Sequence, residues 1–371
     1  MRWLLAEADD SRPVWFTFAA LVSVIGGLAL YIAVFIRSGE YPFEEWKLTQ
    51  FHASYLEYGF IKRGVIGTIF LFIFEFLDLE RTEKIISVVI FDGVLFFFFV
   101  WLLRHVLFRA GADRNWALVF AILLVMSPLG LSQWSFDVGR LDHLNFILFL
   151  FCAFALHHQR PALSGLLAGL CVLIHEAFAV YAIPGLIFIE MALARSRKEN
   201  VSTRSLALIA SPSLLAFLLV AIWGNIEDPA DLQKLATHYD GFEVWSRGFL
   251  EPSLTLGVPG YLVVAAYLAL IYALFFRFFV EVGGRCAATL LLVVPLLLFI
   301  AGKDYARWLH IIFISFFIVL NSTQGLLPRS RTPFGRLEKV CFLLLCIPLG
   351  PIGITTALPF VPYFGGLLFK G

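Results

Sequence analysis

The stretch PALSGLLAGLCVLIHEAFAVYAIPGLIFIEMALAR, residues 161–195, decides the fold class. It is almost entirely apolar, but it is too long for a single membrane span, which takes about 20 residues. His175, Glu176 and Pro184 interrupt it. Interrupted helices at membrane depth are tolerated where they are buried in protein or line a wet cavity. We therefore predict a pair of short or broken helices that leave one face of a bilayer and return to it.

The composition of the whole chain agrees with a protein solvated by lipid. Of its 371 residues, 60% are apolar and 15% charged, whereas soluble domains carry about 45–50% apolar and about 25% charged residues. We predict an all-α fold, a polytopic transmembrane bundle of about 10–12 helices, in a single integral membrane domain over residues 1–371. Further spans are expected near residues 13–36, 85–103, 115–134, 143–157, 204–224, 259–276, 286–301, 305–321 and 338–356.

The distribution of Lys and Arg between the short loops predicts the orientation of the helices. The basic clusters at 195–204 and 329–339 mark the inner face. Residues 65–79, which include Glu75, are expected to dip into the membrane without crossing it; a full crossing would invert the N-terminal part. With this assignment, a polar cavity should open on the outer face, where the polar segments emerge: 37–63, 135–142, 175–176, 225–258 and 302–307. The longest of them, 225–258, is expected to form a small extramembrane lid.

Several function classes are disfavoured by the composition. A net charge of +1 argues against nucleic-acid partners, because such proteins need a basic face. The chain has no Walker loop, dinucleotide fingerprint or G-x-S-x-G elbow, so nucleotide-driven chemistry is unsupported. The five cysteines fall in apolar runs without a CxxC pair, so neither a zinc site nor a disulfide framework is expected.

The first of four motifs is EYGFIKRG, residues 57–64, followed by Gly67. Lys62 and Arg63 stand at the start of an apolar helix, and Gly64 and Gly67 permit close approach of another backbone. A helix N-terminus beside two cations suits an anion such as a diphosphate. The alternative is an interfacial anchor, whose Lys and Arg reach the lipid headgroups.

The second motif, SFDVGRLDH at 135–143, packs Asp137, Arg140, Asp142 and His143 between two spans. A mixed-sign cluster flanked by apolar runs favours a site, because ionisable groups at membrane depth cost about 2.5–3.5 kcal/mol each. The alternative is a structural ion pair that closes a helix–helix turn.

The third motif is the adjacent pair His175-Glu176 within the long apolar stretch. It is not HExxH, because position 179 is Ala, so the zincin interpretation fails. The pair can serve as an oriented general base or contribute one metal ligand. A core histidine with a buried glutamate partner is the alternative.

The fourth motif is GKDYARWLH, residues 302–310. On a helix, Asp304 and Arg307 share a face, so Asp304 is expected to hold the Arg307 guanidinium and leave its fork of N–H donors free for phosphate or carboxylate. Trp308 suits a sugar face or the interfacial aromatic belt. The alternative is an interfacial ion pair beside a belt aromatic. Glu75 and Asp92, within apolar runs, are expected to be buried partners of basic groups.

In this order the four blocks resemble a group of bacterial membrane proteins from polysaccharide gene clusters. The pattern of that group is Tyr-Gly-Phe-x-x-Arg-Gly-x-x-Gly, D-x-G-R-x-D, a His-Glu in an apolar helix, and D-x-x-R-W. Its members resemble O-antigen or capsule repeat-unit polymerases and multi-spanning GT-C-like glycosyltransferases that use lipid-linked sugars. One departure is Ala306, where Gly is common, and Ala is also small. The matching blocks here are Tyr58 to Gly67, Asp137 to Asp142, His175-Glu176 and Asp304 to Trp308.

The resemblance implies sugar transfer from an undecaprenyl-diphosphate carrier at the periplasmic face of the bacterial inner membrane. From the residues themselves, we expect a lipid-linked saccharide and the bilayer as partners, and no cofactor. A diphosphate leaving group needs fixed cations, and an acceptor hydroxyl needs a base. The residues expected to bind substrate are Lys62, Arg63, Arg140, Asp304, Arg307 and Trp308, and those expected to be catalytic are Asp137, Asp142, His143, His175 and Glu176.

Two other classes of function stay open at this stage. One is a metal-dependent intramembrane hydrolase, although the many arginines around its ligands disfavour a cation; those ligands would come from Asp137, Asp142, His143, His175, Glu176 and His310. The other is a transporter of lipid-linked sugars, because broken helices are typical of transporters. The absence of an internal repeat in the sequence, and charges gathered at one face rather than at the midplane, disfavour transport.

Overall fold

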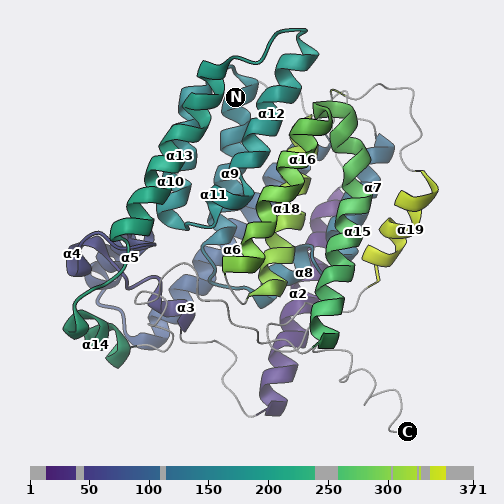
Figure 1. The fold of residues 1–371 in the computed structure, drawn as a ribbon. Coiled ribbons are helices and arrows are strands. Elements are labelled where there is room, and N and C mark those ends of the chain that lie inside the picture. The colour runs from purple at the N-terminus through teal and green to yellow at the C-terminus, as the bar shows by residue number, and fades with distance from the viewer. Residues whose placement is uncertain are drawn as a thin grey trace, which may run out of the picture.

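The computed structural model is all-α over the residues that it describes (Figure 1). These residues are 14–38, 46–108, 114–238, 258–301, 304–323, 326 and 335–347, and they contain no strand. Six helical segments are long and apolar enough to cross a membrane, since about 20 helical residues span the hydrocarbon core. They are Arg81–Leu107 (α6), Ala117–Phe136 (most of α7 with α8), Phe178–Ser196 (α11 and α12), Thr203–Trp223 (α13), Val258–Gly283 (α15) and Tyr305–Thr323 (α18).

Within the described residues, five shorter apolar helical segments add to these six, so the predicted multi-pass helical fold is confirmed. Of the last predicted span, 338–356, the structure describes only the helix Arg336–Leu345 (α19) and two residues after it. The shorter apolar segments are Val14–Ala29 in α2 (Val14–Ser38), Gly64–Phe76 (α5), Asp142–His157 (α9), Pro161–Ile174 (α10) and Arg285–Ile300, which contains α16 (Arg285–Val293).

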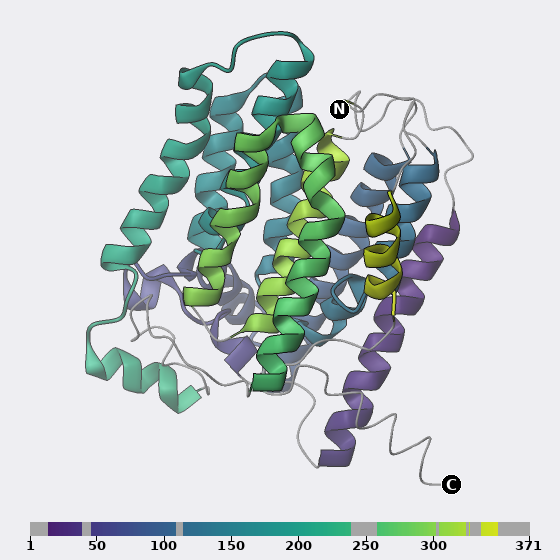
Figure 2. The same cartoon turned by 45° about the vertical axis from the view of Figure 1, so that its right-hand side comes forward.

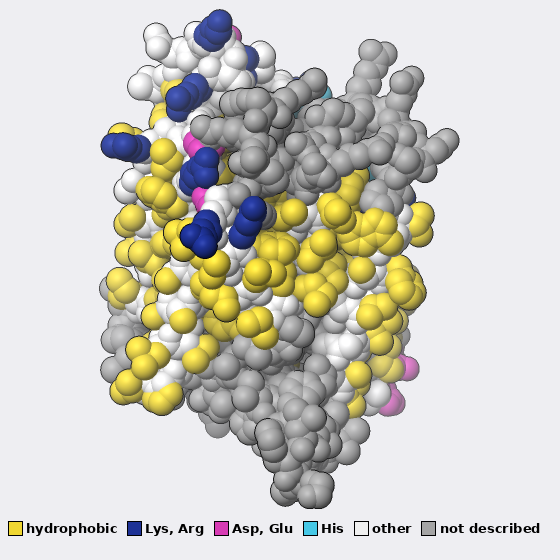
Figure 3. Space-filling view, turned by 90° about the vertical axis from the view of Figure 1, so that its right-hand side faces the viewer, with side chains coloured by type: hydrophobic (Ala, Val, Ile, Leu, Met, Phe, Trp, Pro, Cys, Tyr) yellow, Lys and Arg dark blue, Asp and Glu magenta, His cyan; other side chains and the backbone are white. Residues whose placement is uncertain are grey.

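The apolar and polar side chains are distributed as in a lipid-solvated bundle. Every residue of α18 is buried, and α18 packs against α9, α12 and α15. The outer helices expose large apolar side chains, such as Phe97 on α6 and Leu214 on α13. Figure 3 shows hydrophobic side chains over the middle of one face, with Lys and Arg gathered toward its upper end. A belt of this kind matches the hydrocarbon core of a bilayer.

The stretch 161–195 forms the predicted broken pair. α10 begins with a proline at its first turn, where the missing N–H costs nothing. It ends where His175 becomes extended, with φ −153° and ψ 116°. A single turn, Phe178–Tyr181 (α11), precedes Ile183–Ser196 (α12), whose start again holds a proline. α10 and α12 both pack on α9 and α13, and the break between them brings His175 and Glu176 into the polar end of the bundle (Figure 1).

Two glycines allow α10 to lie against α13 at short range. A Cβ on Gly165 would collide with the backbone carbonyl of Leu208, and one on Gly169 would come within 3.2 Å of the Pro212 carbonyl oxygen. Small residues at such spacing let helix backbones meet in the membrane. The close contact sets the position of α10, and through its C-terminal end the position of His175.

We expect Gly165→Val to destabilise the protein by about 1–3 kcal/mol, the usual cost of overpacking. The measurement is the thermal unfolding midpoint of the purified protein in detergent. Gly93→Val on α6 is the matched control, because nothing lies within 4 Å of a Cβ at Gly93. Equal midpoints for the two variants would contradict the close packing of α10 on α13.

α5 does not run the length of the bundle. Its 13 residues extend for about 20 Å, less than the roughly 30 Å of a hydrocarbon core. Phe70 and Phe74 pack with Val88 near the start of α6, and with Leu141 and Ile174 at the polar end. Figure 2 shows this region at the lower end of the molecule, near the short helix Pro229–His238 (α14). The structure therefore agrees with a segment that dips in without crossing.

The polar segments predicted to share one face do meet at one end of the bundle. The Lys62 N–H donates to the Gly224 carbonyl at 2.8 Å, and the Gln50 amide donates to the Gly139 carbonyl at 2.6 Å. Of the expected lid, 225–258, the structure describes Asn225 to His238 and Val258, and residues 239–257 lie outside the described part. α14 rests on this end, where Lys234 pairs with Glu57. A lid function stays a prediction.

Candidate functional site

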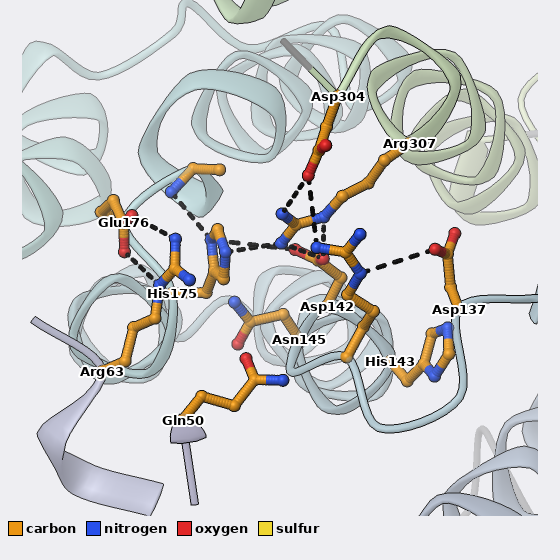
Figure 4. Close-up of polar contacts among 12 residues, drawn as sticks. Gln50, Arg63, Asp137, Asp142, His143, Asn145, His175, Glu176, Asp304 and Arg307 are labelled. Carbon is orange, nitrogen blue, oxygen red and sulfur yellow. Dashed lines mark hydrogen bonds and ion pairs between the residues drawn. The ribbon is translucent and has the colours of Figure 1, made fainter. Parts of the chain in front are cut away.

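Three arginines and four carboxylates from the four sequence motifs form one cluster at the polar end of the bundle (Figure 4). Arg307, at the start of α18, lies at its centre. Its Nε donates to Asp142 Oδ2 at 2.7 Å, and its Nη2 lies 2.5 Å from the same oxygen. Nη1 reaches Asp304 Oδ2 at 3.4 Å. Both residues of the Arg307–Asp142 pair are almost fully buried.

This arrangement differs from the sequence prediction in one respect. Asp304 was expected to hold Arg307 and leave its fork free for a phosphate or carboxylate, whereas the Asp142 carboxylate of the protein itself occupies the Nε–Nη2 edge. The reason is position: Asp142 is the first residue of α9, which packs along α18, so its carboxylate faces Arg307 across the helix interface. Asp304 immediately precedes α18 and reaches only Nη1. The remaining donor capacity of Arg307 is therefore on its Nη1 side.

His175 lies beside this pair, close to the Arg307 guanidinium. Arg307 Nη2 is 2.6 Å from His175 Nε2, and the Ala177 N–H lies 3.3 Å from Nδ1. Because a guanidinium only donates, Nε2 must accept; the proton of the neutral ring is then on Nδ1, so the Ala177 N–H is a neighbour of Nδ1 and not a second hydrogen-bond donor to it. Asp142 Oδ1, which has no hydrogen-bond partner, lies 3.8 Å from Nδ1. His175 can act as a base only when Arg307 moves away from Nε2.

Arg140 joins the second and fourth motifs. Its Nη1 donates to Asp304 Oδ2 at 3.3 Å, and its Nε lies 3.5 Å from Asp137 Oδ1. The other Asp137 oxygen accepts from the Gln133 amide at 3.1 Å. One oxygen of Asp304 therefore bridges two guanidinium groups, those of Arg140 and Arg307. The loop turns sharply at Gly139, whose φ of +84° suits glycine.

Arg63 and Glu176 form an ion pair in which both side chains are slightly exposed, by 12% and 10%. Arg63 Nη2 donates to Glu176 Oε1 at 2.8 Å, and its Nε donates to Oε2 at 3.3 Å. Arg63 precedes α5 in a left-handed conformation, with φ 65° and ψ 5°. The glycines that follow permit the turn: a Cβ on Gly64 would strike the Tyr55 ring, and one on Gly67 the Ala53 carbonyl. The motif thus aims Arg63 at Glu176.

Lys62 points to a different neighbour. Its ammonium donates to the side-chain oxygen of Asn225 at 3.0 Å. Burial lowers the pKa of Lys62 to about 8; the Glu176 carboxylate opposes this shift and the Arg63 cation adds to it. Lys62 is therefore a cation near neutral pH whose charge titrates just above it.

Any anion affinity that Lys62 contributes should fall as pH rises through about 8, because the lowered pKa means that the charge is present below that value and lost above it. Binding of inorganic pyrophosphate to the purified protein, measured at pH about 7 and about 9, should weaken more in wild type than in Lys62→Gln. Lys234→Gln, at the half-exposed Lys234 on α14, is the control and should keep the wild-type slope. Parallel pH profiles for wild type and Lys62→Gln would exclude a role for Lys62 in anion binding.

His143 lies apart from the arginine cluster, in a second buried group. Its Nδ1 is 2.6 Å from Asp92 Oδ1, and the Trp134 ring stacks on it at 3.9 Å while donating to Asp92 Oδ2. His310 donates from Nδ1 to the Leu129 carbonyl. The Nε2 atoms of both histidines are buried without a hydrogen-bond partner. Glu75 and Asp92 were both expected to be buried partners of basic groups: Asp92 is buried and its partner is a histidine of the second motif, whereas Glu75 is exposed.

Trp308 of the fourth motif lies beside Arg307. The Arg307 guanidinium lies 5.0 Å from the Trp308 ring centroid, a cation–π distance. Trp308 is largely buried, and Lys303 lies outside the described residues. Sequence reasoning missed Gln133, on Leu131–Phe136 (α8), and Asn225, because single amide side chains give no pattern. Gln133 precedes Asp137 of the second motif by four residues, and only the hydrogen bond between the two side chains reveals its role.

The charges of the cluster balance. The balance includes Lys62, which is hydrogen-bonded to Asn225; the four cations then equal the carboxylates in number, which are those of Asp137, Asp142, Glu176 and Asp304. Paired charges of this kind are tolerated at membrane depth, where single ones are costly. In the described part of the chain, no three His, Cys, Asp or Glu side chains are grouped to hold a metal. The geometry is that of a charged cluster in which each of the three guanidinium groups is paired with at least one carboxylate.

Comparisons with known proteins add no further assignment. No protein-family model matches the chain, and neither curated proteins nor solved structures give a significant match.

Proposed function

We propose that the protein is a membrane glycosyltransferase of the polymerase type. It transfers a saccharide from an undecaprenyl-diphosphate carrier to a glycan or lipid-linked acceptor at the outer face of the bacterial inner membrane. The polar end of the bundle, where the four motifs meet, would face the periplasm, because the basic clusters 195–204 and 329–339 mark the inner side.

The observation that carries the proposal is the convergence of Arg63, Arg140 and Arg307 at one end of a lipid-solvated bundle. They come from three motifs far apart in sequence. A diphosphate leaves with its charge on several oxygens, and guanidinium groups match phosphate oxygens in geometry and charge. Cations held in place before the reaction stabilise that charge as it develops. An amphiphilic donor would approach through the bilayer, with its polar head at this end.

The reaction assigns a role to the carboxylates. An acceptor hydroxyl attacks the anomeric carbon of the donor sugar; the new C–O bond forms as the bond to the phosphate oxygen breaks. The hydroxyl proton passes to a carboxylate, and the diphosphate carrier leaves as an anion beside the arginines. Glu176 is the base we favour, because it is more exposed than Asp142 and is released when a diphosphate engages Arg63. Asp142 holds Arg307, and Asp137 lies on the other side of Arg140.

A glycan profile of a deletion strain tests the proposal. Loss of long chains with a single capped repeat retained would identify a polymerase. A truncated repeat would instead indicate a transferase that adds one monosaccharide. An unchanged profile, with transport of intact lipid-linked sugar by the purified protein in proteoliposomes, would reject the glycosyltransferase and favour a transporter.

A further inference from the structure

We infer that Asp304 occupies the anion site of the empty protein and that the diphosphate of the donor displaces it. The inference rests on the proposed function, because it names which protein group the diphosphate replaces. Asp304 would then set the specificity for anions, because an anion that binds to the arginines must compete with the Asp304 carboxylate. Asp304 is in this view a positioning and selectivity residue, not a catalytic one.

The contacts of Asp304 with the two arginines are long for charge-assisted hydrogen bonds. A single oxygen, Oδ2, reaches Arg140 Nη1 at 3.3 Å and Arg307 Nη1 at 3.4 Å. The Asp142 carboxylate, by contrast, accepts from Arg307 Nε at 2.7 Å. Charge-assisted hydrogen bonds between nitrogen and oxygen are strongest at about 2.7–2.9 Å. The Nη1 groups of Arg140 and Arg307 therefore make long, weak hydrogen bonds to Asp304. A ligand oxygen at a shorter distance from both groups would replace the Asp304 carboxylate.

Asp304 is also the member of this cluster that a ligand can reach. Its side chain is 22% exposed, against 5% for Arg140 and 3% for Asp142. Asp304 stands just before α18, outside the packed helix, whereas Asp142 and Arg307 lie on helices that pack together. Rotation of this one partly exposed side chain would remove its contacts with both Nη1 groups without moving a helix.

The charges explain why such a ligand must be a polyanion. Because the cations and carboxylates of the site balance, a singly charged anion would meet no net attraction. It would replace one carboxylate by another anion of equal charge. A diphosphate brings more charge and several oxygens, so it can accept from Arg140 and Arg307 together and also reach Arg63. Asp304 would therefore favour diphosphates over ordinary monoanions.

The test measures binding of inorganic pyrophosphate to the purified full-length protein in nanodiscs. Asp304→Asn keeps the size and the capping ability of the side chain but removes its charge. We expect it to tighten binding by roughly tenfold or more, because an internal competitor is lost. Asp137→Asn is the matched control: it also removes a carboxylate beside Arg140, but one that does not bridge the two Nη1 groups. It should change affinity by less than about threefold.

The outcomes separate the inference from the proposed function. Weaker or unchanged binding in Asp304→Asn would overturn the inference, as would equal tightening in Asp137→Asn. If Arg63→Ala weakens pyrophosphate binding while Asp304→Asn does not strengthen it, the diphosphate site stands and only the role of Asp304 falls. If the wild-type protein and Asp304→Asn both fail to bind pyrophosphate, both proposals fall. A merely structural Asp304 would give a loss of affinity and never a gain.

Discussion

Arg307→Ala is expected to end polymer formation, with activity lowered by at least about a hundredfold, and to destabilise the protein by about 3–5 kcal/mol. The two losses have different causes. Activity falls because Arg307 is the central cation of the proposed diphosphate site. Stability falls because Asp142 would keep its charge in a buried position without a partner. Chain length on gels and the thermal midpoint of the purified protein measure the two effects.

A double variant separates these causes. In Arg307→Ala/Asp142→Asn the uncompensated charge is gone, so most of the thermal stability should return while polymer stays absent. Arg307→Lys keeps the charge but loses the planar geometry that reaches Asp142, Asp304 and His175 at once, so we expect it to restore little activity. Wild-type chain lengths in the Arg307→Ala strain would contradict the assigned role.

Arg63→Asn is expected to lower polymer formation to a similar degree with a smaller loss of stability, about 1–3 kcal/mol. Asparagine tolerates the left-handed backbone of this position, so the variant removes the cation without adding strain. The Arg63–Glu176 pair is 12% and 10% exposed, so an unpaired Glu176 is better hydrated than an unpaired Asp142. Polymer length in a complemented deletion strain, with protein level on a blot, provides the measurement.

Two comparisons make the Arg63 result specific. Arg160→Asn changes an exposed arginine before α10, far from the motif residues in sequence, and should leave polymer unchanged. The exchange Arg63→Glu/Glu176→Arg keeps an ion pair and should recover stability without activity. If the exchanged pair also restores full-length polymer, then Arg63 has only a structural role.

The elements of the fold were largely predictable because each depends on local chain properties. The broken pair at 161–195 follows from its length and from His175, Glu176 and Pro184 within an apolar run. The short α5 follows from an apolar stretch that is too short for a full membrane span. The number of predicted membrane crossings and the Lys and Arg content of the loops predicted that the polar segments would lie at one end of the bundle. None of these steps needed knowledge of a tertiary contact.

The partners of the site residues were not predictable in the same way. The motifs identified Arg307, Asp142 and His175, but not that Asp142 occupies part of the guanidinium fork expected to be free for phosphate or carboxylate. Asp92, in the middle of α6, pairs with His143 because α6 packs on α9. Hydropathy and motif spacing fix the depth of a residue in the membrane, but not its rotation toward a neighbouring helix. That rotation comes from packing over distant parts of the chain.

The complete enclosure of α18 has a mechanical consequence. The helix that carries Arg307 and His310 has protein on every side and meets no acyl chains. Thicker or thinner bilayers change the tilt of helices that touch lipid, here α6, α13 and α15, which expose large apolar side chains. The register of α18 against α9 is insulated from that adjustment. The arginine cluster at the start of α18 should accordingly keep its geometry in membranes of differing thickness, while the outer helices of the bundle change their tilt.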